Sequence, residues 1–361
     1  MQGFWETLPK PFFVLAPLAN VTDAAFRRVI AKYGKPDVTW TEFVSADGLI
    51  KATPEGKAKL MRDLVFTEAE RPIVAQLFTS NPETMEAAAR LCQELGFDGV
   101  DINMGCPDKS IEKQGAGAKL ITTPDVAREV IRAAKRGADK IPVSVKTRLG
   151  YNKDVLEEWL PVLLAEEPAA LTLHARTRKE MSKVPAHWDR VKRAVEIRNE
   201  LGSKTLIIGN GDALDMEDAK KKAAESDADG VMLGRAIFGR PWLFDEKDPS
   251  ADPLASTGSA TGSAERPQAL YGRPQQSSVA EPATSEDFAQ VATKLRIAVE
   301  HTKLFEELLG DIKNFALMKK HFKAYVEGFD GAKELRMQLM ETNSAAEVEH
   351  IVHEFFVAKK I

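Results

Sequence analysis

Short apolar runs of strand length alternate with longer amphipathic segments from residue 12 to residue 235, and this alternation constrains the fold most strongly. Repeated strand and helix units of this kind build a parallel sheet covered by helices. The runs lie at residues 12–16, 38–44, 73–78, 99–104, 143–147, 170–174, 206–210 and 230–233. Eight such runs predict an α/β chain folded as a closed (β/α)8 TIM barrel rather than an open doubly wound sheet.

The composition changes abruptly after the last run and divides the chain. Residues 245–287 are rich in Pro, Ser, Gly and Ala and lack apolar periodicity, so they predict a flexible linker. From residue 288 to residue 361, apolar residues return at helical spacing, as in Leu304, Leu308 and Leu309. We therefore expect a barrel domain over residues 1–244 and a small all-α domain over residues 288–361.

Charge, hydropathy and cysteine content exclude several classes of protein. The formal net charge of −4 argues against a surface coated with positive charge. No run of about 18 apolar residues occurs and the first residues lack a secretory pattern, so we expect a cytoplasmic protein without a membrane span. The two cysteines, Cys92 and Cys106, are too few for a disulfide scaffold and have no neighbouring histidines to form a metal site.

Polar residues stand where the apolar runs end. TIM-barrel enzymes carry their functional groups at the C-terminal ends of the strands, so a site is sought among these residues. They are Pro17, Glu42, Gln76, Asn103, Cys106, Lys146, Arg148, His174, Arg176, Asn210, Gly211, Asp212, Gly234 and Arg235. Any one of them can be an ordinary loop residue, but together they predict a site at the mouth of the barrel.

The last two runs end in glycine-containing turns, at residues 209–212 (GNGD) and 233–235 (LGR). Loops after the seventh and eighth strands of TIM barrels commonly bind phosphate, because glycine lets backbone N–H groups approach the anion. Arg235 can add a charge-assisted contact to the same phosphate. These turns predict a phosphate-bearing ligand.

Lys146 lies within an otherwise apolar run, so its ammonium needs an anionic partner at the barrel mouth. A lysine beside a flavin would stabilise the negative charge of the reduced ring, whereas a lysine that forms a Schiff base would indicate an aldolase. The residues around Lys146 do not separate these two interpretations. His174 can contact the same ligand or have a structural role.

The two cysteines are expected to differ in role. Cys106 follows a strand directly, so its thiol should face the barrel mouth, where it is a candidate functional group. Cys92 lies in a helical segment rich in alanine and is expected to be a small buried residue.

Several segments at these strand ends resemble the tRNA-dihydrouridine synthases. They are residues 16–23 (APLANVTD), 103–107 (NMGCP), 115–118 (GAGA), 174–177 (HART) and 210–212 (NGD). The resemblance extends beyond the barrel, because residues 319–325 (KKHFKAY) and 331–336 (GAKELR) are similar to the helical tRNA-binding segment of that family. The order and spacing of the segments make the combination specific.

The resemblance implies FMN at the barrel mouth and NADPH (or NADH) as the reductant. It implies FMN contacts from Pro17, Leu18, Ala19, Gln76, Lys146, His174, Asn210, Gly211, Asp212, Gly234 and Arg235. It further implies hydride delivery to C6 of a uridine in tRNA, with Cys106 donating a proton to C5. The reference pKa of a thiol, about 8.5, suits that role near neutral pH.

The implied partner is tRNA, and we expect a monomer without a metal. The residues expected to contact the substrate are Asn103, Arg148, Arg176, Arg178, Lys319, Lys320, His321, Lys323 and Arg336. Lysines and arginines among them would meet RNA phosphates, although lysines on a helix can also form a merely solvated face.

Three other functions stay open at this point. One is an FMN-dependent barrel oxidoreductase acting on a free pyrimidine, against which the basic helical segment argues. Another is a Schiff-base aldolase that uses Lys146 and needs no flavin. The third is a noncatalytic RNA-binding protein that keeps the barrel as a scaffold.

Overall fold

The computed structural model describes residues 2–245 and 285–360 of the chain. Apart from its first residue and its last three, the expected linker over residues 245–287 lies outside the described residues. The helix that follows begins at Ser285, slightly before the expected start of the helical domain. None of the helices in the two described ranges is long and apolar enough to cross a membrane.

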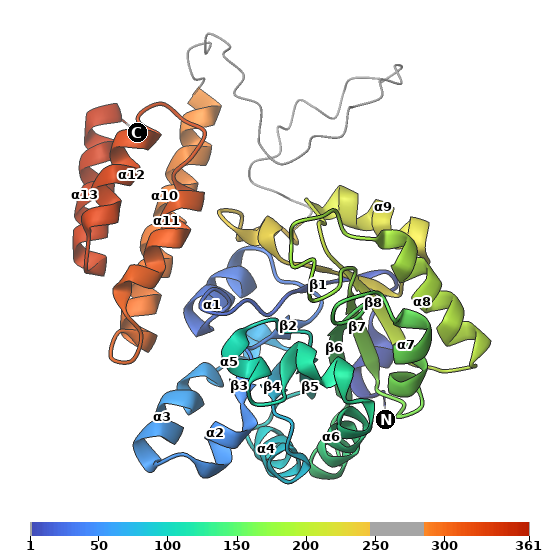
Figure 1. The fold of residues 1–361 in the computed structure, drawn as a ribbon. Helices are drawn as coiled ribbons and strands as arrows, with labels where there is room; N and C mark the ends of the chain where they lie inside the picture. The colour runs from blue at the N-terminus through green and yellow to red at the C-terminus, as the bar shows by residue number, and fades with distance from the viewer. Residues whose placement is uncertain (1, 246–284, 361) are drawn as a thin grey trace, which may run out of the picture.

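The strands pair in parallel and form a barrel (Figure 1). They are β1 (Phe12–Leu15), β2 (Thr39–Trp40), β3 (Val44–Ser45), β4 (Ile73–Phe78), β5 (Gly99–Met104), β6 (Val143–Arg148), β7 (Ala170–His174), β8 (Leu206–Asn210) and β9 (Gly230–Leu233). Their order is β1-β9-β8-β7-β6-β5-β4-β2, and a bridge between Val14 and Val38 closes the ring. The predicted TIM barrel is confirmed, but the run expected at residues 38–44 is split into β2 and β3.

Alternate residues of the strands face opposite sides of the barrel wall. Large apolar residues fill the interior below the mouth: Trp5, Phe12, Val14, Trp40, Val74, Ile208 and Met232 pack in one buried cluster. On β5 the outward residues Val100, Ile102 and Met104 instead join the larger core between strands and helices. The inward residues Asp101 and Asn103 are polar and buried.

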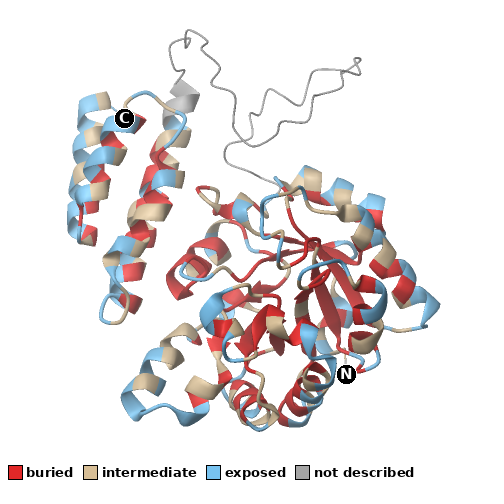
Figure 2. Cartoon of the chain, in the orientation of Figure 1, coloured by how far each residue is buried: buried red, intermediate tan, exposed pale blue. Residues whose placement is uncertain are grey.

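Helices surround this barrel, and Figure 2 shows their buried faces turned toward the strands. They are α1 (Ala24–Tyr33), α2 (Ala46–Lys51), α3 (Pro54–Asp63), α4 (Pro82–Glu94), α5 (Lys109–Glu112), α6 (Pro124–Gly137), α7 (Leu156–Leu164), α8 (Trp188–Glu200) and α9 (Met216–Ser226). Cys92 is fully buried on α4, and burial raises the pKa of its thiol to about 12. This agrees with the packing role expected for Cys92.

The C-terminal region is entirely helical within its described residues and packs against α1 (Figure 1). Its helices are α10 (Ser285–Leu309), α11 (Lys319–Tyr325), α12 (Ala332–Glu341) and α13 (Ala345–Lys359). Phe26 and Ile30 of α1 share one buried apolar cluster with Leu295, Phe305 and Phe322 of this region. The helical region is therefore joined to the barrel by a continuous apolar core.

Polar contacts also join the helical region to the loops at the barrel mouth. Lys313 Nζ lies 2.6 Å from Glu42 Oε2 and 2.8 Å from Asp63 Oδ1. Glu42 also accepts a hydrogen bond from the backbone N–H of Asn20, whose carbonyl oxygen accepts from Lys320 Nζ at 2.6 Å. The backbone N–H and C=O of Asn20 are thus bound by Glu42, which pairs with Lys313 of the helical region, and by Lys320 of that region.

His321 corrects one expectation from the sequence. It was expected to meet RNA phosphate, but only 1% of it is exposed. Its ring packs edge-on against His301, with centroids 4.6 Å apart, and against Phe26 at 4.9 Å. His321 Nδ1 and His301 Nε2 are buried and have no hydrogen-bond partner among the residues that the structure describes. The helical period of α11 turns His321 toward α1, because the exposed face is taken by Lys323.

This buried pair makes the fold sensitive to acid. Burial, together with the nearby charge of Lys320, lowers the pKa of His321 to about 3, and burial also lowers the pKa of His301 well below its ordinary value. The unfolded chain therefore binds protons first as the pH falls below about 6.5, and stability is lost from there downward. At pH 5 the loss from His321 is about 2 kcal/mol.

We expect the difference in free energy of unfolding between the wild type and His321→Phe to shift by about 2 kcal/mol between pH 7 and pH 5. Urea unfolding at both pH values measures this shift. Parallel pH profiles for the two proteins would show that His321 is not buried in its neutral form.

Candidate functional site

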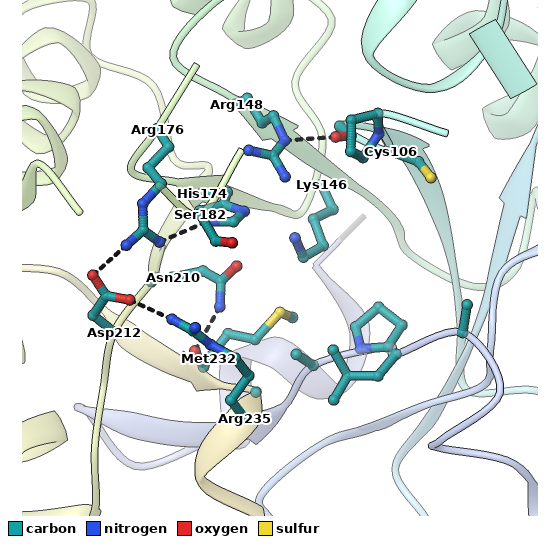
Figure 3. A pocket seen from close by; sticks show the side chains of 18 of the residues that line it. Cys106, Lys146, Arg148, His174, Arg176, Ser182, Asn210, Asp212, Met232 and Arg235 are labelled. Carbon is teal, nitrogen blue, oxygen red and sulfur yellow. Dashed lines mark hydrogen bonds and ion pairs between the residues drawn. The ribbon is translucent and has the colours of Figure 1, made fainter. Parts of the chain in front are cut away.

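A cavity of about 680 Å³ opens at the C-terminal ends of the strands (Figure 3). This volume is within the usual range for small-molecule and cofactor sites. All the residues expected to bind a cofactor line it: Pro17, Leu18, Ala19, Gln76, Lys146, His174, Asn210, Gly211, Asp212, Gly234 and Arg235. Cys106, Asn103, Arg148 and Arg176 line it as well. The structure therefore gathers strand-end residues from the entire barrel around one space.

Strand register explains this convergence. Arg148 of β6 is paired with His174 of β7, which is paired with Asn210 of β8, and Asn210 with Met232 of β9. Asn210 Nδ2 also donates to the carbonyl oxygen of Met232 at 2.8 Å. Neighbouring strands thus place these inward side chains at the same height along the barrel axis.

Lys146 projects its ammonium into the cavity (Figure 3). Among the described residues, its Nζ forms neither a hydrogen bond nor an ion pair. Burial, followed by the charge of Arg148, lowers the pKa of Lys146 to about 8. A buried ammonium without a partner is costly, so the cavity is suited to an anionic ligand at this point.

The charges around the cavity are predominantly positive. Its lining contains Lys146, Arg148, Arg176 and Arg235 but a single carboxylate, Asp212. Burial and the surrounding cations lower the pKa of His174 well below its ordinary value, so its imidazole is neutral. A neutral imidazole can accept a hydrogen bond on one nitrogen and donate one from the other.

Asp212 organises the glycine-rich end of the cavity. Its carboxylate pairs with Arg176 and lies 2.7 Å from Arg235 Nη2 (Figure 3). Arg176 is 2% exposed, so it is part of the cavity wall rather than a rim residue available to RNA phosphate. Arg235 is 64% exposed in its side chain and stays accessible to an anion from solvent.

Cys106 lies in the turn after β5, with its sulfur directed to the cavity (Figure 3). Burial raises the pKa of its thiol above the ordinary value, which keeps the proton on sulfur at neutral pH. Gly117 packs on this turn with φ +61°, and a Cβ there would lie 2.7 Å from the Cys106 carbonyl oxygen. Glycine at position 117 therefore permits close packing against the Cys106 turn.

Four other residues expected to contact the substrate do not line the cavity, and they differ in their polar contacts. Arg178 pairs with Glu112 and stacks on Tyr151 at 5.1 Å, and Arg336 donates to the carbonyl oxygen of Val326 at 3.2 Å. Lys323 is exposed and Lys319 half-buried on α11. Among the described residues, Arg178 is ion-paired and Arg336 is hydrogen-bonded, whereas the ammonium groups of Lys319 and Lys323 form no hydrogen bond or ion pair.

Sequence reasoning missed two kinds of site residue. Phe43, Met181 and Ser182 line the cavity from loops, and no periodic pattern marks them. Asp101 lies beneath the cavity, and its signal was visible as an acidic residue within the apolar run at 99–104. Within residues 2–245 and 285–360, no group of three or more His, Cys, Asp or Glu side chains is arranged to hold a metal.

A closed parallel barrel with a cation-lined cavity at its mouth defines a TIM-barrel enzyme built around an anionic ligand. The family model for dihydrouridine synthase (Dus) matches residues 14–360. A probable tRNA-dihydrouridine synthase of Staphylococcus aureus (strain COL) is 38% identical over 356 residues, covering 98% of this chain and 96% of the relative. Probable tRNA-dihydrouridine synthase 2 of Bacillus subtilis (strain 168) is 38% identical over 355 residues, covering 98% and 97%. The chain therefore belongs to the dihydrouridine synthase family and is an oxidoreductase that acts on a CH–CH bond.

Proposed function

We propose that this protein reduces the C5–C6 double bond of uridine in tRNA, using FMN and NAD(P)H. The observation that carries the proposal is the cavity that brings the Lys146 ammonium and the Cys106 thiol together at the barrel mouth. An anionic cofactor and a proton donor are the two components that such a reduction needs.

The residues present suit FMN. The unpaired Lys146 is placed to meet the negative charge of a reduced flavin ring. At the glycine-rich end of the cavity, the exposed guanidinium of Arg235 and the turn at Gly211 are suited to the phosphate of FMN. Gly211 has φ +131°, which places its backbone in a conformation that favours glycine. Pro17, Leu18 and Ala19 would contact the ring from the loop that follows β1.

When bound, FMN supplies hydride chemistry, taking two electrons from NAD(P)H for delivery to C6 of uridine. Cys106 supplies the proton: its S–H bond breaks, a C–H bond forms at C5, and the thiolate regains a proton from water. Because its pKa is raised, the Cys106 thiol holds its proton before the reaction. Asn103 and Arg148, which line the cavity near Cys106, would position the base.

The base must leave the RNA stack to enter the cavity, so the surrounding surface must hold the RNA backbone. Lys319, Lys320 and Lys323 on α11 are proposed to meet phosphates there. Lys320 Nζ donates to the carbonyl oxygen of Asn20, in the loop after β1. Residues 17–19 of the same loop line the cavity, so this part of the proposed RNA surface adjoins it. We also propose that residues 288–361 act as the tRNA-binding domain, and that the enzyme is a cytoplasmic monomer.

Replacing both Lys319 and Lys323 by Gln is expected to weaken tRNA binding and to reduce the slope of log Kd against log salt by about 1 for each phosphate that is no longer neutralised. Lys140 and Lys204 provide a matched control, because both are exposed and precede β6 and β8 at the opposite end of the barrel. Fluorescence titrations at several salt concentrations measure the slope. An unchanged slope in the Lys319/Lys323 variant would show that these two lysines of α11 do not contact RNA phosphates.

The reaction itself is tested with the purified protein, FMN, NADPH and tRNA that lacks dihydrouridine. Mass spectrometry of the digested nucleosides should show dihydrouridine in the tRNA and none from free uridine or uracil under the same conditions. Reduction of the free pyrimidine alone would favour the other flavin oxidoreductase. Trapping of Lys146 by borohydride without any flavin requirement would favour an aldolase.

A further inference from the structure

A buried carboxylate below the cavity has no role in the function proposed above. Asp101 on β5 is 0% exposed. Ser144 Oγ donates to its Oδ1 at 2.6 Å, and Gln76 Nε2 donates to its Oδ2 at 2.6 Å. Burial raises the pKa of Asp101 to about 6, against these two hydrogen bonds and the charge of Lys146, so the group is mainly ionised at neutral pH. An ionised carboxylate only accepts hydrogen bonds.

Hydrogen bonds continue from Gln76 to the turn that carries the thiol. Gln76 Oε1 accepts from Asn103 Nδ2 at 3.0 Å. Asn103 Oδ1 in turn accepts from the backbone N–H groups of Gly105 and Cys106, at 3.1 and 2.9 Å. Three consecutive links thus connect the Asp101 carboxylate to the backbone of Cys106.

The two ends of this chain of hydrogen bonds fix its direction. The carboxylate of Asp101 can only accept, and the backbone N–H of Cys106 can only donate. Turning the amide of Gln76 around would place its oxygen against the carboxylate and leave its NH₂ group facing that of Asn103. Because the network is buried, such unmade contacts are costly.

We propose that Asp101 is a positioning residue: its carboxylate orients the Gln76 and Asn103 amides and thereby holds the Cys106 turn in place at the cavity. This inference rests on the proposed role of Cys106 in uridine reduction. The geometry of the turn can nevertheless be probed without turnover, through the reactivity of the thiol.

Two substitutions separate the hydrogen bond from simple packing. Asp101→Asn keeps an acceptor for Gln76 and can donate its NH₂ group to Ser144, so thiol reactivity and kcat should stay within about threefold of the wild type. Asp101→Ala removes the acceptor and frees the turn. Its kcat for uridine reduction should fall about 10²-fold with KM for tRNA little changed. Iodoacetamide should alkylate its Cys106 about fivefold faster, because the thiol becomes more exposed.

Alkylation is followed by mass spectrometry in the full-length protein, with the buried Cys92 as the internal reference. Ser144→Ala is the matched control, since it removes the other partner of Asp101 but leaves the link to Gln76. It should behave as the wild type does. If Asp101→Ala is not recovered folded, Asp101→Val fills the space and also lacks an acceptor.

A wild-type alkylation rate in folded Asp101→Ala or Asp101→Val would overturn the proposal, as would an equal loss of kcat in Asp101→Asn and Asp101→Ala. Failure of the proposed function gives a different result, because the wild-type protein would then form no dihydrouridine. The alkylation comparison would still decide whether Asp101 holds the Cys106 turn.

Discussion

Cys106→Ala is expected to lower the rate of dihydrouridine formation by about 10²- to 10⁴-fold, the usual contribution of a positioned proton donor. The substitution removes one sulfur from the cavity wall and none of the cations, so FMN should bind as it does in the wild type. Reduction of bound FMN by NADPH should also be unchanged, because that step does not need a proton on the uracil ring.

Stopped-flow absorbance separates these two half-reactions, and nucleoside analysis measures the product. Cys92→Ala is the control, since Cys92 is fully buried on α4 and away from the cavity. Near-normal dihydrouridine formation by Cys106→Ala would reject the thiol as the proton donor. Loss of FMN binding would instead indicate that Cys106 supports the cofactor site.

Lys146→Met is expected to weaken FMN binding about 10- to 100-fold and to slow uridine reduction further, because it removes an ammonium that forms no hydrogen bond or ion pair with any other described residue. The pKa of Lys146 is lowered to about 8, chiefly by burial. In the wild type, the affinity for reduced FMN should therefore decline as the pH rises above 8, since the neutral amine no longer attracts the negative charge of the reduced ring.

The variant should lose this pH dependence, which isothermal titration between pH 7 and pH 9 measures. Lys140→Met changes an exposed lysine before the same strand and should leave both affinity and pH profile intact. An unaltered FMN affinity in Lys146→Met would show that the ammonium does not face the flavin.

The barrel and the residues around its mouth were predictable because they depend on local pattern. Apolar runs of strand length gave seven of the strand positions, and the polar residues that end them, such as Lys146 and His174, do line one cavity. In parallel barrels the ends of all strands meet at one face, so position in the sequence was enough to place them. The single strand predicted over residues 38–44 was wrong, because Glu42 and Phe43 lie outside the sheet, between β2 and β3.

Features that depend on long-range packing were not predictable in the same way. The helical spacing at residues 319–325 predicts a helix but does not say which face meets α1, so His321 was assigned to the surface. The contact of Lys313 with Glu42 joins residues far apart in the chain. Asp101 looked like an interruption of an apolar run, and its partners are shown only by the registers of β5 with β4 and β6, which pair it with Gln76 and Ser144.

Titration of the purified chain with FMN shows whether a flavin binds in the cavity of Figure 3, on which the proposed reduction of uridine depends. We predict a yellow protein that binds one equivalent of FMN, with quenching of the flavin fluorescence that is weakened in Lys146→Met. A colourless protein that takes up no added FMN would rule out a flavin-dependent reduction at this site.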